Sequence, residues 1–227
     1  MKIGTTEIFP TKIICLGRNY EEHAKEMKSP IPKEPIFFCK TANCLIKDGE
    51  PIIYPRILYE NKELNRVDHE VELAVIIKKR CKNIKAEDFE NYILGYTIFL
   101  DITARNMQLK DRGINLPWYR SKNFDTFGPI GPKIVEKINN LHNLKIELKV
   151  NGEERQSSNT KNMIFKIPEI IEYLSKYVTL DSSDVIATGT PSGVSAIQPG
   201  DILEATIENI GTLTSKVILE DVESKSL

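Results

Sequence analysis

Two acidic side chains lie one residue apart where an apolar segment begins. The segment DHEVELAVII places Glu70 and Glu72 at the start of a run of β-branched and aliphatic residues that is typical of a buried strand. Side chains alternate between the faces of a strand, so both carboxylates point the same way, with Cα atoms roughly 6.5–7 Å apart. Like charges so close together oppose ionisation. Solvent at the strand end, a basic partner or a divalent cation would each relieve this repulsion.

A third acid ends the next apolar run, GYTIFL. Asp101 follows that run directly and precedes a segment that predicts a helix, so its carboxylate could cap the helix. The alternative is that Asp101 lies beside Glu70 and Glu72. Three hard oxygen ligands without a nearby cysteine would suit Mg²⁺ or Mn²⁺ and leave positions open for water and substrate.

The histidines differ in what surrounds them. His23 lies in EEHAKE, where a short helix would place Glu26 on the same face, three residues later. A carboxylate bonded to one imidazole nitrogen fixes the tautomer and makes the other nitrogen a better base. An ordinary surface pair has the same spacing and is the alternative. His69 points to the strand face opposite the two glutamates, and His142 lies in a polar turn, so neither is expected in a site.

Two further segments could bind an anion. Lys122 lies among aromatic residues in a loop interrupted by Gly and Pro, where its ammonium could neutralise an anionic substrate or be exposed. The stretch TGTPSG, residues 188–193, follows an expected strand, and its N–H groups and hydroxyls could bind a carboxylate. It lacks the lysine and spacing of a phosphate-binding P-loop, so no nucleotide site is expected there.

The elements that must position these residues are mostly strands. Hydrophobic periodicity predicts strands over residues 11–16, 36–39, 70–78, 92–100, 145–150, 184–188, 201–207 and 212–219. It predicts helices over residues 20–27, 86–90, 103–111 and 168–175. Asn151-Gly152 predicts a tight hairpin after the fifth of these strands. Many strands with few helices predict an α+β, mostly β fold rather than a parallel βαβ sheet.

Composition restricts the class of protein. The chain has 227 residues, 41% of them hydrophobic and 28% charged, which suits a globular core. Its 31 basic and 32 acidic residues give a net charge of −1, without the basic excess of a nucleic-acid-binding protein. No apolar run reaches the roughly 18–20 residues that span a bilayer. The first residues show no signal or transit pattern, so a cytoplasmic protein is expected.

Domain organisation and cysteine usage add little about function. We expect one catalytic domain over residues 1–227, although several prolines within residues 1–50 leave a small N-terminal lobe as an alternative. The four cysteines form no C-x-x-C pair, and most lie in apolar stretches. They are expected to be buried thiols rather than disulfide or zinc ligands.

Seven segments resemble, in order, the small acylpyruvase-like members of the fumarylacetoacetate hydrolase family. They are GRNYEEHAKEM, DHEVELAVIIKK, GYTIFLDITARNMQ, RSKNFDTFGPIGP, VNGEERQSSNTKNMIF, ATGTPSGV and PGDILEATIENIGTLTSKV. The resemblance covers most of the chain from Ile13 onward. It implies a mixed β-roll of the type of the family's C-terminal domain, usually dimeric. It also implies Mg²⁺ or Mn²⁺ held by the three acids described above, with a His–Glu dyad on a segment that closes as a lid.

Mapped onto this sequence, the resemblance implies further site residues. His23 and Glu26 match the dyad, Lys122 the active-site lysine, and Thr190 a threonine that binds the substrate carboxylate. Positions near the substrate in such enzymes correspond to Arg18, Arg105 and Gln108. The sequence departs from the family at Lys40-Thr41-Ala42, where Lys-Pro-Ser/Thr is more usual.

The activity that the resemblance implies is divalent-metal-dependent chemistry on small 2-oxo acids. Acylpyruvates would undergo C–C hydrolysis, and oxaloacetate decarboxylation or tautomerisation, through a metal-bound enolate. One alternative is a 2-hydroxyhepta-2,4-diene-1,7-dioate isomerase or decarboxylase of aromatic catabolism, and another is a non-catalytic binding member of the fold. The expected partners are a small 2-oxo acid and a second copy of the chain, with no nucleic acid and no membrane.

Overall fold

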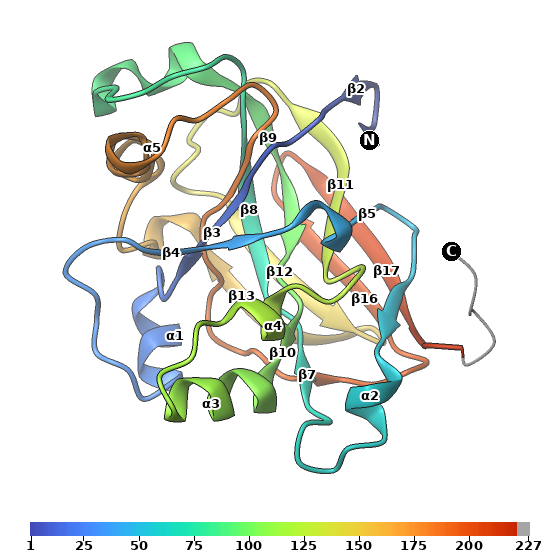
Figure 1. Ribbon diagram of the computed structural model, residues 1–227. Helices are drawn as coiled ribbons and strands as arrows, with labels where there is room; N and C mark the ends of the chain where they lie inside the picture. Colours follow the sequence, from blue (N-terminus) through green and yellow to red (C-terminus); the bar gives the residue numbers. More distant parts are fainter. Residues whose placement is uncertain (222–227) are drawn as a thin grey trace.

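The computed structural model describes residues 1–221, and its largest sheet has seven strands in mixed orientation (Figure 1). In order across the sheet, these are β4 (Ile36–Lys40), β3 (Ile13–Gly17), β14 (Val185–Ala187), β8 (Val71–Ile77), β9 (Ile93–Leu100), β11 (Gly128–Val135) and β5 (Leu45–Lys47). The pairs β14–β3 and β11–β5 are parallel, and the other pairs are antiparallel. The acidic segment therefore enters the middle of the fold on β8.

A second sheet has five strands. In order, these are β13 (Glu153–Asn159), β12 (Lys145–Val150), β16 (Ile202–Ile207), β17 (Gly211–Leu219) and β6 (Ile52–Tyr54). The hairpin between β12 and β13 turns at Asn151 and Gly152, both at positive φ (54° and 81°), which confirms the Asn-Gly prediction. Two smaller sheets join β1 (Lys2–Ile3) to β2 (Thr6–Glu7), and β10 (Thr103–Ala104) to β7 (Val67–Asp68) and β15 (Ala196–Ile197).

The helices are short and lie around the sheets (Figure 1). They are α1 (Glu21–Glu26), α2 (Arg56–Tyr59), α3 (Arg105–Gly113), α4 (Tyr119–Lys122) and α5 (Ile167–Tyr177), with 3₁₀ turns η1 (Ala42–Cys44), η2 (Ala86–Tyr92) and η3 (Thr160–Asn162). Within residues 1–221, no helix is long and apolar enough to cross a membrane. The predicted α+β, mostly β fold is confirmed.

Strand β8 lies between two hydrophobic clusters. One face carries Val71, Leu73, Val75 and Ile77 into the larger cluster, which also contains Leu148 and Leu203 of the second sheet. The other face carries Ala74 and Ile76 into a smaller cluster with Cys15 and Phe99. Because both faces are buried, a one-residue slip in register would exchange the two sets of side chains. The core therefore holds both glutamates on one face, as the alternation predicted.

Several predicted elements differ from the structure. Strand β11 was not predicted because its first five residues, GPIGP, interrupt the apolar pattern. Strand β13 was missed because its sequence is polar and much of it is exposed. The helix predicted from residue 103 begins instead at Arg105, since Thr103 and Ala104 pair with β7. Cys39 is exposed rather than buried, because it lies on the edge strand β4, whereas the other three cysteines are buried.

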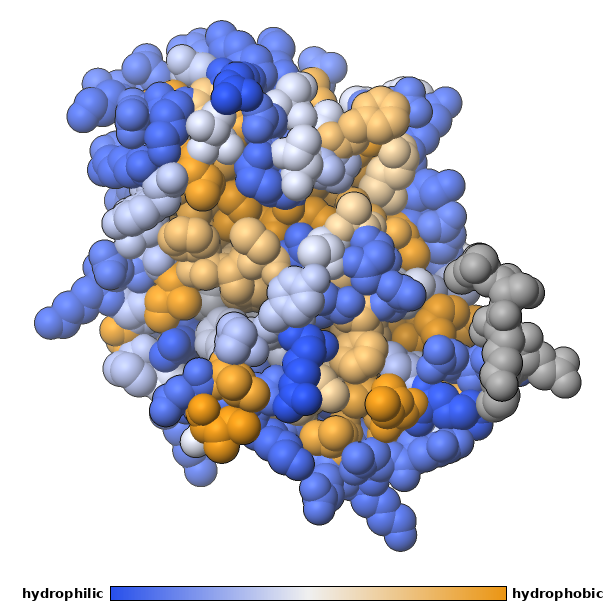
Figure 2. Space-filling model, in the orientation of Figure 1, coloured by the Kyte–Doolittle hydropathy of each residue, from blue (hydrophilic) through white to orange (hydrophobic). Residues whose placement is uncertain are grey.

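Strand β4 contributes a half-buried aromatic surface. Apolar side chains gather in the middle of the face shown in Figure 2, over β4, with polar side chains around them. Phe38 of β4 packs edge-on against Trp118, with ring centroids 5.5 Å apart. These two rings form one wall of the pocket described next.

Candidate active site

Strands β8 and β9 bring three acids together. Their antiparallel register pairs Val71 with Leu100, so Glu70 lies opposite Asp101, and the Asp101 N–H donates to the Glu70 carbonyl at 2.9 Å. Glu72 leaves the same face of β8 two residues later. One carboxylate oxygen from each acid lies within 4.8 Å of those from the others, and all three side chains are buried. Register and burial thus create a compact oxygen cluster.

Asp101 does not cap a helix. The N-cap position of α3 belongs to Ala104, three residues further on. The Asp101 carboxylate instead accepts hydrogen bonds from Lys40 at 2.8 Å and Lys122 at 2.5 Å. Of the two interpretations that the sequence left open, the structure therefore supports the one that groups Asp101 with the glutamates.

Lys122 is buried at the end of α4, not exposed in a loop. Its ammonium contacts Glu70 at 2.9 Å, Asp101 at 2.5 Å and the Thr103 hydroxyl at 2.7 Å. Burial alone disfavours the ammonium, but the negative charges of Asp101 and Glu70 raise the pKa of Lys122. This lysine therefore carries a fixed positive charge against two members of the acidic cluster.

Arg105, at the start of α3, holds Glu70 from another side. Its guanidinium donates to Asp68 at 2.8 Å, to Gln108 at 2.6 Å and to Glu70. Burial opposes ionisation of Glu70, but the nearby charges of Lys122 and Arg105 hold the Glu70 pKa well below its usual range. All three guanidinium nitrogens of Arg105 therefore donate to other side chains, and its side chain orients Glu70.

Glu72 differs from the other two acids. Within residues 1–221, its carboxylate forms no ion pair and accepts one hydrogen bond, from the N–H of Gly189 at 2.8 Å. Burial, and then the negative charges of Asp101 and Glu70, raise the pKa of Glu72 well above its usual value. The three acids offer hard oxygen ligands, and the charge of Glu72 is not balanced by a basic side chain within residues 1–221. Such a set of ligands fits a divalent cation such as Mg²⁺ or Mn²⁺.

Helix α1 presents the expected His–Glu pair. His23 Nδ1 lies 3.0 Å from Glu26 Oε2, and the N–H of Gly193 donates to Glu26 Oε1 at 3.0 Å. Burial would raise the Glu26 pKa, but the hydrogen bonds from His23 and Gly193 hold it below its usual value. An ionised Glu26 accepts a hydrogen bond from the Nδ1–H of His23. This tautomer leaves Nε2 of His23 with its lone pair.

The segment 188–193 binds carboxylates of the protein itself. The N–H groups of Gly189 and Gly193 hold Glu72 and Glu26, so these two groups are not free to bind a substrate. At Gly189, with φ +91°, a Cβ would lie 2.7 Å from the Asn19 Cβ, so only glycine fits. The loop therefore positions both the acidic cluster and the His–Glu pair.

Thr190 is fixed by a residue that the sequence did not single out. Its hydroxyl donates to the Val71 carbonyl at 2.8 Å and accepts from Gln156 Nε2 at 2.8 Å. Gln156 Oε1 also accepts from the Val71 N–H and contacts His69 Nδ1 at 2.9 Å. Gln156 is buried on the polar strand β13, and a lone buried amide leaves no pattern in a sequence. His69, as expected, lies away from the acids, with Ser195 at its other nitrogen.

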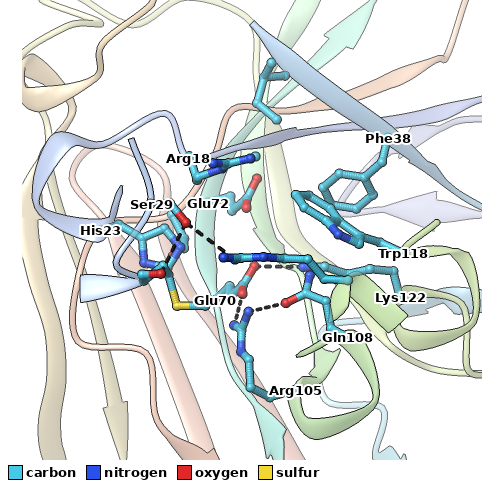
Figure 3. Close-up of a pocket in the computed structure, with 15 residues that line it drawn as sticks. Arg18, His23, Ser29, Phe38, Glu70, Glu72, Arg105, Gln108, Trp118 and Lys122 are labelled. Atoms are coloured by element: carbon cyan, nitrogen blue, oxygen red, sulfur yellow. Dashed lines mark hydrogen bonds and ion pairs between the residues drawn. The ribbon is translucent and has the colours of Figure 1, made fainter. Parts of the chain in front are cut away.

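Most of these side chains line one pocket (Figure 3). All the site residues singled out from the sequence line it except Glu26 and Asp101, which contact lining residues instead. Arg18 lies at the end of β3 with a positive φ of 59° and reaches into the pocket. Phe38 of β4, Arg112 of α3 and Trp118 before α4 also line the pocket and were not predicted, because nothing in the sequence relates these segments to one another.

Comparison with known proteins agrees with this architecture. The model of the fumarylacetoacetate (FAA) hydrolase C-terminal family matches residues 12–218. The chain belongs to the fumarylacetoacetate hydrolase family. An uncharacterized protein of Pyrococcus abyssi is 54% identical, over 96% of this chain and 95% of that protein. The mitochondrial oxaloacetate tautomerase fahd-1 of Caenorhabditis elegans is 43% identical, over 86% of this chain and 88% of that protein.

Solved structures of the family superpose closely. Fumarylpyruvate hydrolase from Pseudomonas aeruginosa, in complex with Mn²⁺ and pyruvate, gives a TM-score of 0.86 at 32% identity, covering 96% of this chain and 94% of that one. The 2-hydroxyhepta-2,4-diene-1,7-dioate isomerase from Mycobacterium marinum gives 0.82 at 36% identity, covering 94% and 76%. The family includes hydrolases, isomerases and tautomerases, so membership identifies an enzyme fold without choosing the reaction.

Proposed function

We propose that this protein is a Mg²⁺- or Mn²⁺-dependent enzyme that acts on small 2-oxo acids, by tautomerisation or decarboxylation of oxaloacetate or by C–C hydrolysis of acylpyruvates. The observation that carries the proposal is the convergence of Glu70, Glu72 and Asp101, with carboxylate oxygens within 4.8 Å of one another, where Glu70 and Glu72 line the same pocket as His23. An oxygen cluster and a base at one cavity are the parts that enolate chemistry needs.

The acids would hold the metal ion. When bound, a divalent cation would polarise the carboxylate and 2-oxo oxygens of the substrate and stabilise negative charge on the keto oxygen. Glu70 and Asp101 are oriented by Lys122, and Glu72 by the Gly189 N–H, so the ligand set is held in place by the protein. Within residues 1–221, Glu72 is the member of the cluster without an ion-pair partner.

His23 would move the proton. Because Glu26 fixes the Nδ1 proton, Nε2 can accept a proton either from a substrate carbon or from a water molecule. Taking a proton from C3 of oxaloacetate would yield the enolate, and delivering a proton to its C2 oxygen would complete the conversion of the keto form to the enol. Taking it from water would yield the hydroxide that attacks the C4 carbonyl of an acylpyruvate. The C3–C4 bond would then break, the acyl group would leave as a carboxylate, and the pyruvate enolate would take up a proton at C3. Decarboxylation of oxaloacetate needs no attacking water.

Two relatives support different members of this group of reactions. The tautomerase from Caenorhabditis elegans supports proton transfer on oxaloacetate, and the hydrolase from Pseudomonas aeruginosa supports C–C cleavage. The isomerase from Mycobacterium marinum keeps the processing of aromatic ring-cleavage products as a second candidate. A substrate panel separates these reactions because each consumes a different compound.

The test follows the loss of oxaloacetate, acetylpyruvate and a 2-hydroxyhepta-2,4-diene-1,7-dioate, with Mg²⁺, with Mn²⁺ and with EDTA. We expect turnover of at least one substrate that EDTA abolishes and added metal restores. Turnover that is unaffected by EDTA, or that survives Glu70→Ala, contradicts the proposal. Metal and oxalate binding without any turnover would instead indicate the non-catalytic alternative.

Assembly and location are part of the same proposal. The family resemblance supports a homodimer, and light scattering of the purified chain tests it, with a mass near twice 25.8 kDa expected. A monomer at micromolar concentration would contradict it. The cytoplasmic location and the lack of nucleic-acid or membrane partners stay predictions.

A further inference from the structure

The pocket contains two arginines without carboxylate partners. Arg18 follows β3, and Arg112 lies in the last turn of α3 (Figure 3 labels Arg18). Within residues 1–221, neither guanidinium forms an ion pair with an acidic side chain, and Arg112 donates one long hydrogen bond, to the Ser29 hydroxyl at 3.4 Å. Burial, followed by the charge of Arg112, lowers the pKa of Arg18, so the two like charges influence each other.

The other cations at the pocket are already compensated. Lys122 and Arg105 contact Glu70, and Lys40 contacts Asp101 behind the pocket. Among the described residues that line the pocket, the basic side chains without an acidic partner are therefore Arg18 and Arg112. A guanidinium binds a carboxylate through paired, charge-assisted hydrogen bonds, and two neighbouring guanidiniums favour an anion between them.

An apolar wall lines the same cavity. Phe38 and Trp118 pack edge to face, and a Cβ on Gly17 would lie 3.1 Å from the Trp118 ring. Glycine at this position lets the indole lie against the backbone next to Arg18. Aromatic faces suit a carbon chain. The pocket therefore combines an acidic cluster, an apolar wall and a pair of uncompensated cations.

We propose that Arg18 and Arg112 form a distal carboxylate subsite, which makes the enzyme prefer 2-oxo acids that carry a second carboxylate. The inference rests on the proposed function, because it assigns the keto-acid end of the substrate to the acidic cluster. Arg112 on α3 donates hydrogen bonds to the distal carboxylate, and so does Arg18 on the segment that leads into α1. The bound dicarboxylate thereby connects α3 to the helix that carries His23.

A matched pair of substrates tests this subsite. Fumarylpyruvate and acetylpyruvate undergo the same C–C hydrolysis, but only the first has a distal carboxylate. We expect Arg112→Gln to lower kcat/KM for fumarylpyruvate about 10- to 100-fold, the usual value of a charged hydrogen bond. For acetylpyruvate, the change should stay below about threefold, the range of a surface substitution. Arg112→Lys keeps the charge without the paired donors and should fall between wild type and Arg112→Gln.

Lys110→Gln is the matched control. Lys110 lies on the same helix, is exposed, and pairs with exposed Glu63, so its loss changes net charge equally without touching the pocket. It should leave both substrates unaffected. An equal loss for both substrates in Arg112→Gln, or no loss for either, overturns the subsite while leaving the proposed function intact.

Binding separates the two proposals if hydrolysis is absent. The rise in Tm produced by oxaloacetate and by pyruvate, each with Mg²⁺, is measured for the wild type and for Arg18→Gln and Arg112→Gln. A larger rise with oxaloacetate that both substitutions remove supports the subsite even when no acylpyruvate is turned over. Equal rises with oxaloacetate and pyruvate in the wild type contradict it.

Discussion

Lys122 and Glu70 form a buried ion pair, with the ammonium nitrogen 2.9 Å from Glu70 Oε2. The same ammonium lies 2.5 Å from Asp101, so one cation from α4 compensates acids that come from two neighbouring strands. Removing one partner of such a pair leaves the other charge buried and uncompensated. The short helix α4 and the acidic cluster therefore depend on each other for stability.

Lys122→Met should lower the free energy of unfolding by about 3–5 kcal/mol in the presence of EDTA. Added Mn²⁺ should recover part of that loss, because a cation at the cluster would compensate the same carboxylates. Urea unfolding with EDTA and with Mn²⁺ measures both effects. Lys145→Met, which removes an exposed partner of Glu147, is the control and should change little. A loss of similar size in both variants would contradict the role assigned to Lys122.

Asp101→Asn should weaken metal binding by at least about tenfold, because it replaces an ionised ligand with a neutral amide. Calorimetric titration with Mn²⁺ measures the Kd of wild type and variant. Glu63→Gln removes an equal charge from an exposed position and should leave the Kd unchanged. Unchanged affinity in Asp101→Asn would remove Asp101 from the metal ligands.

His23→Ala should reduce acylpyruvate hydrolysis by about 10²- to 10⁴-fold, the range of a general base. Oxaloacetate decarboxylation should fall much less, since it needs no activated water. Lys25→Ala, at an exposed position of the same helix, controls for changes in α1 and should leave both rates unaffected. Equal losses of the two activities in His23→Ala would show that the histidine does not serve mainly to activate water.

Asp111 and Arg120 should make stability depend on pH. The hydrogen bond from Arg120, 2.8 Å at its Nε, lowers the pKa of Asp111. A pKa lowered by folding contributes stability that is present above the unfolded value, about 3.9, and is lost as pH falls through the folded value. Asp111→Asn should therefore be less stable than wild type at neutral pH, and the difference should shrink below about pH 4. Urea unfolding at a series of pH values measures this, and a difference independent of pH would contradict it.

Local pattern predicted one strand with its exact bounds. The strand predicted over residues 145–150 coincides with β12, because its apolar side chains alternate and the Asn-Gly turn ends it. Its hairpin partner β13 was not predicted, because an exposed edge strand carries few apolar residues. Strand β11 was not predicted, because Gly and Pro interrupt its apolar pattern. Pairing with β9 and β5 nevertheless holds it extended. Tertiary pairing can thus impose a strand where local propensity is weak.

Spacing within a single strand or helix was enough to predict which side chains lie together on one face. Glu70 and Glu72 had to share a face of β8, and His23 and Glu26 had to meet within one helical turn, because strand and helix periods require it. The groups from distant segments that contact these side chains follow from how the chain packs. Asp101 reaches the glutamates through strand register, and Lys122, Gly189 and Gly193 reach them through packing of remote segments. Such contacts join residues far apart in the chain, so no local period encodes them.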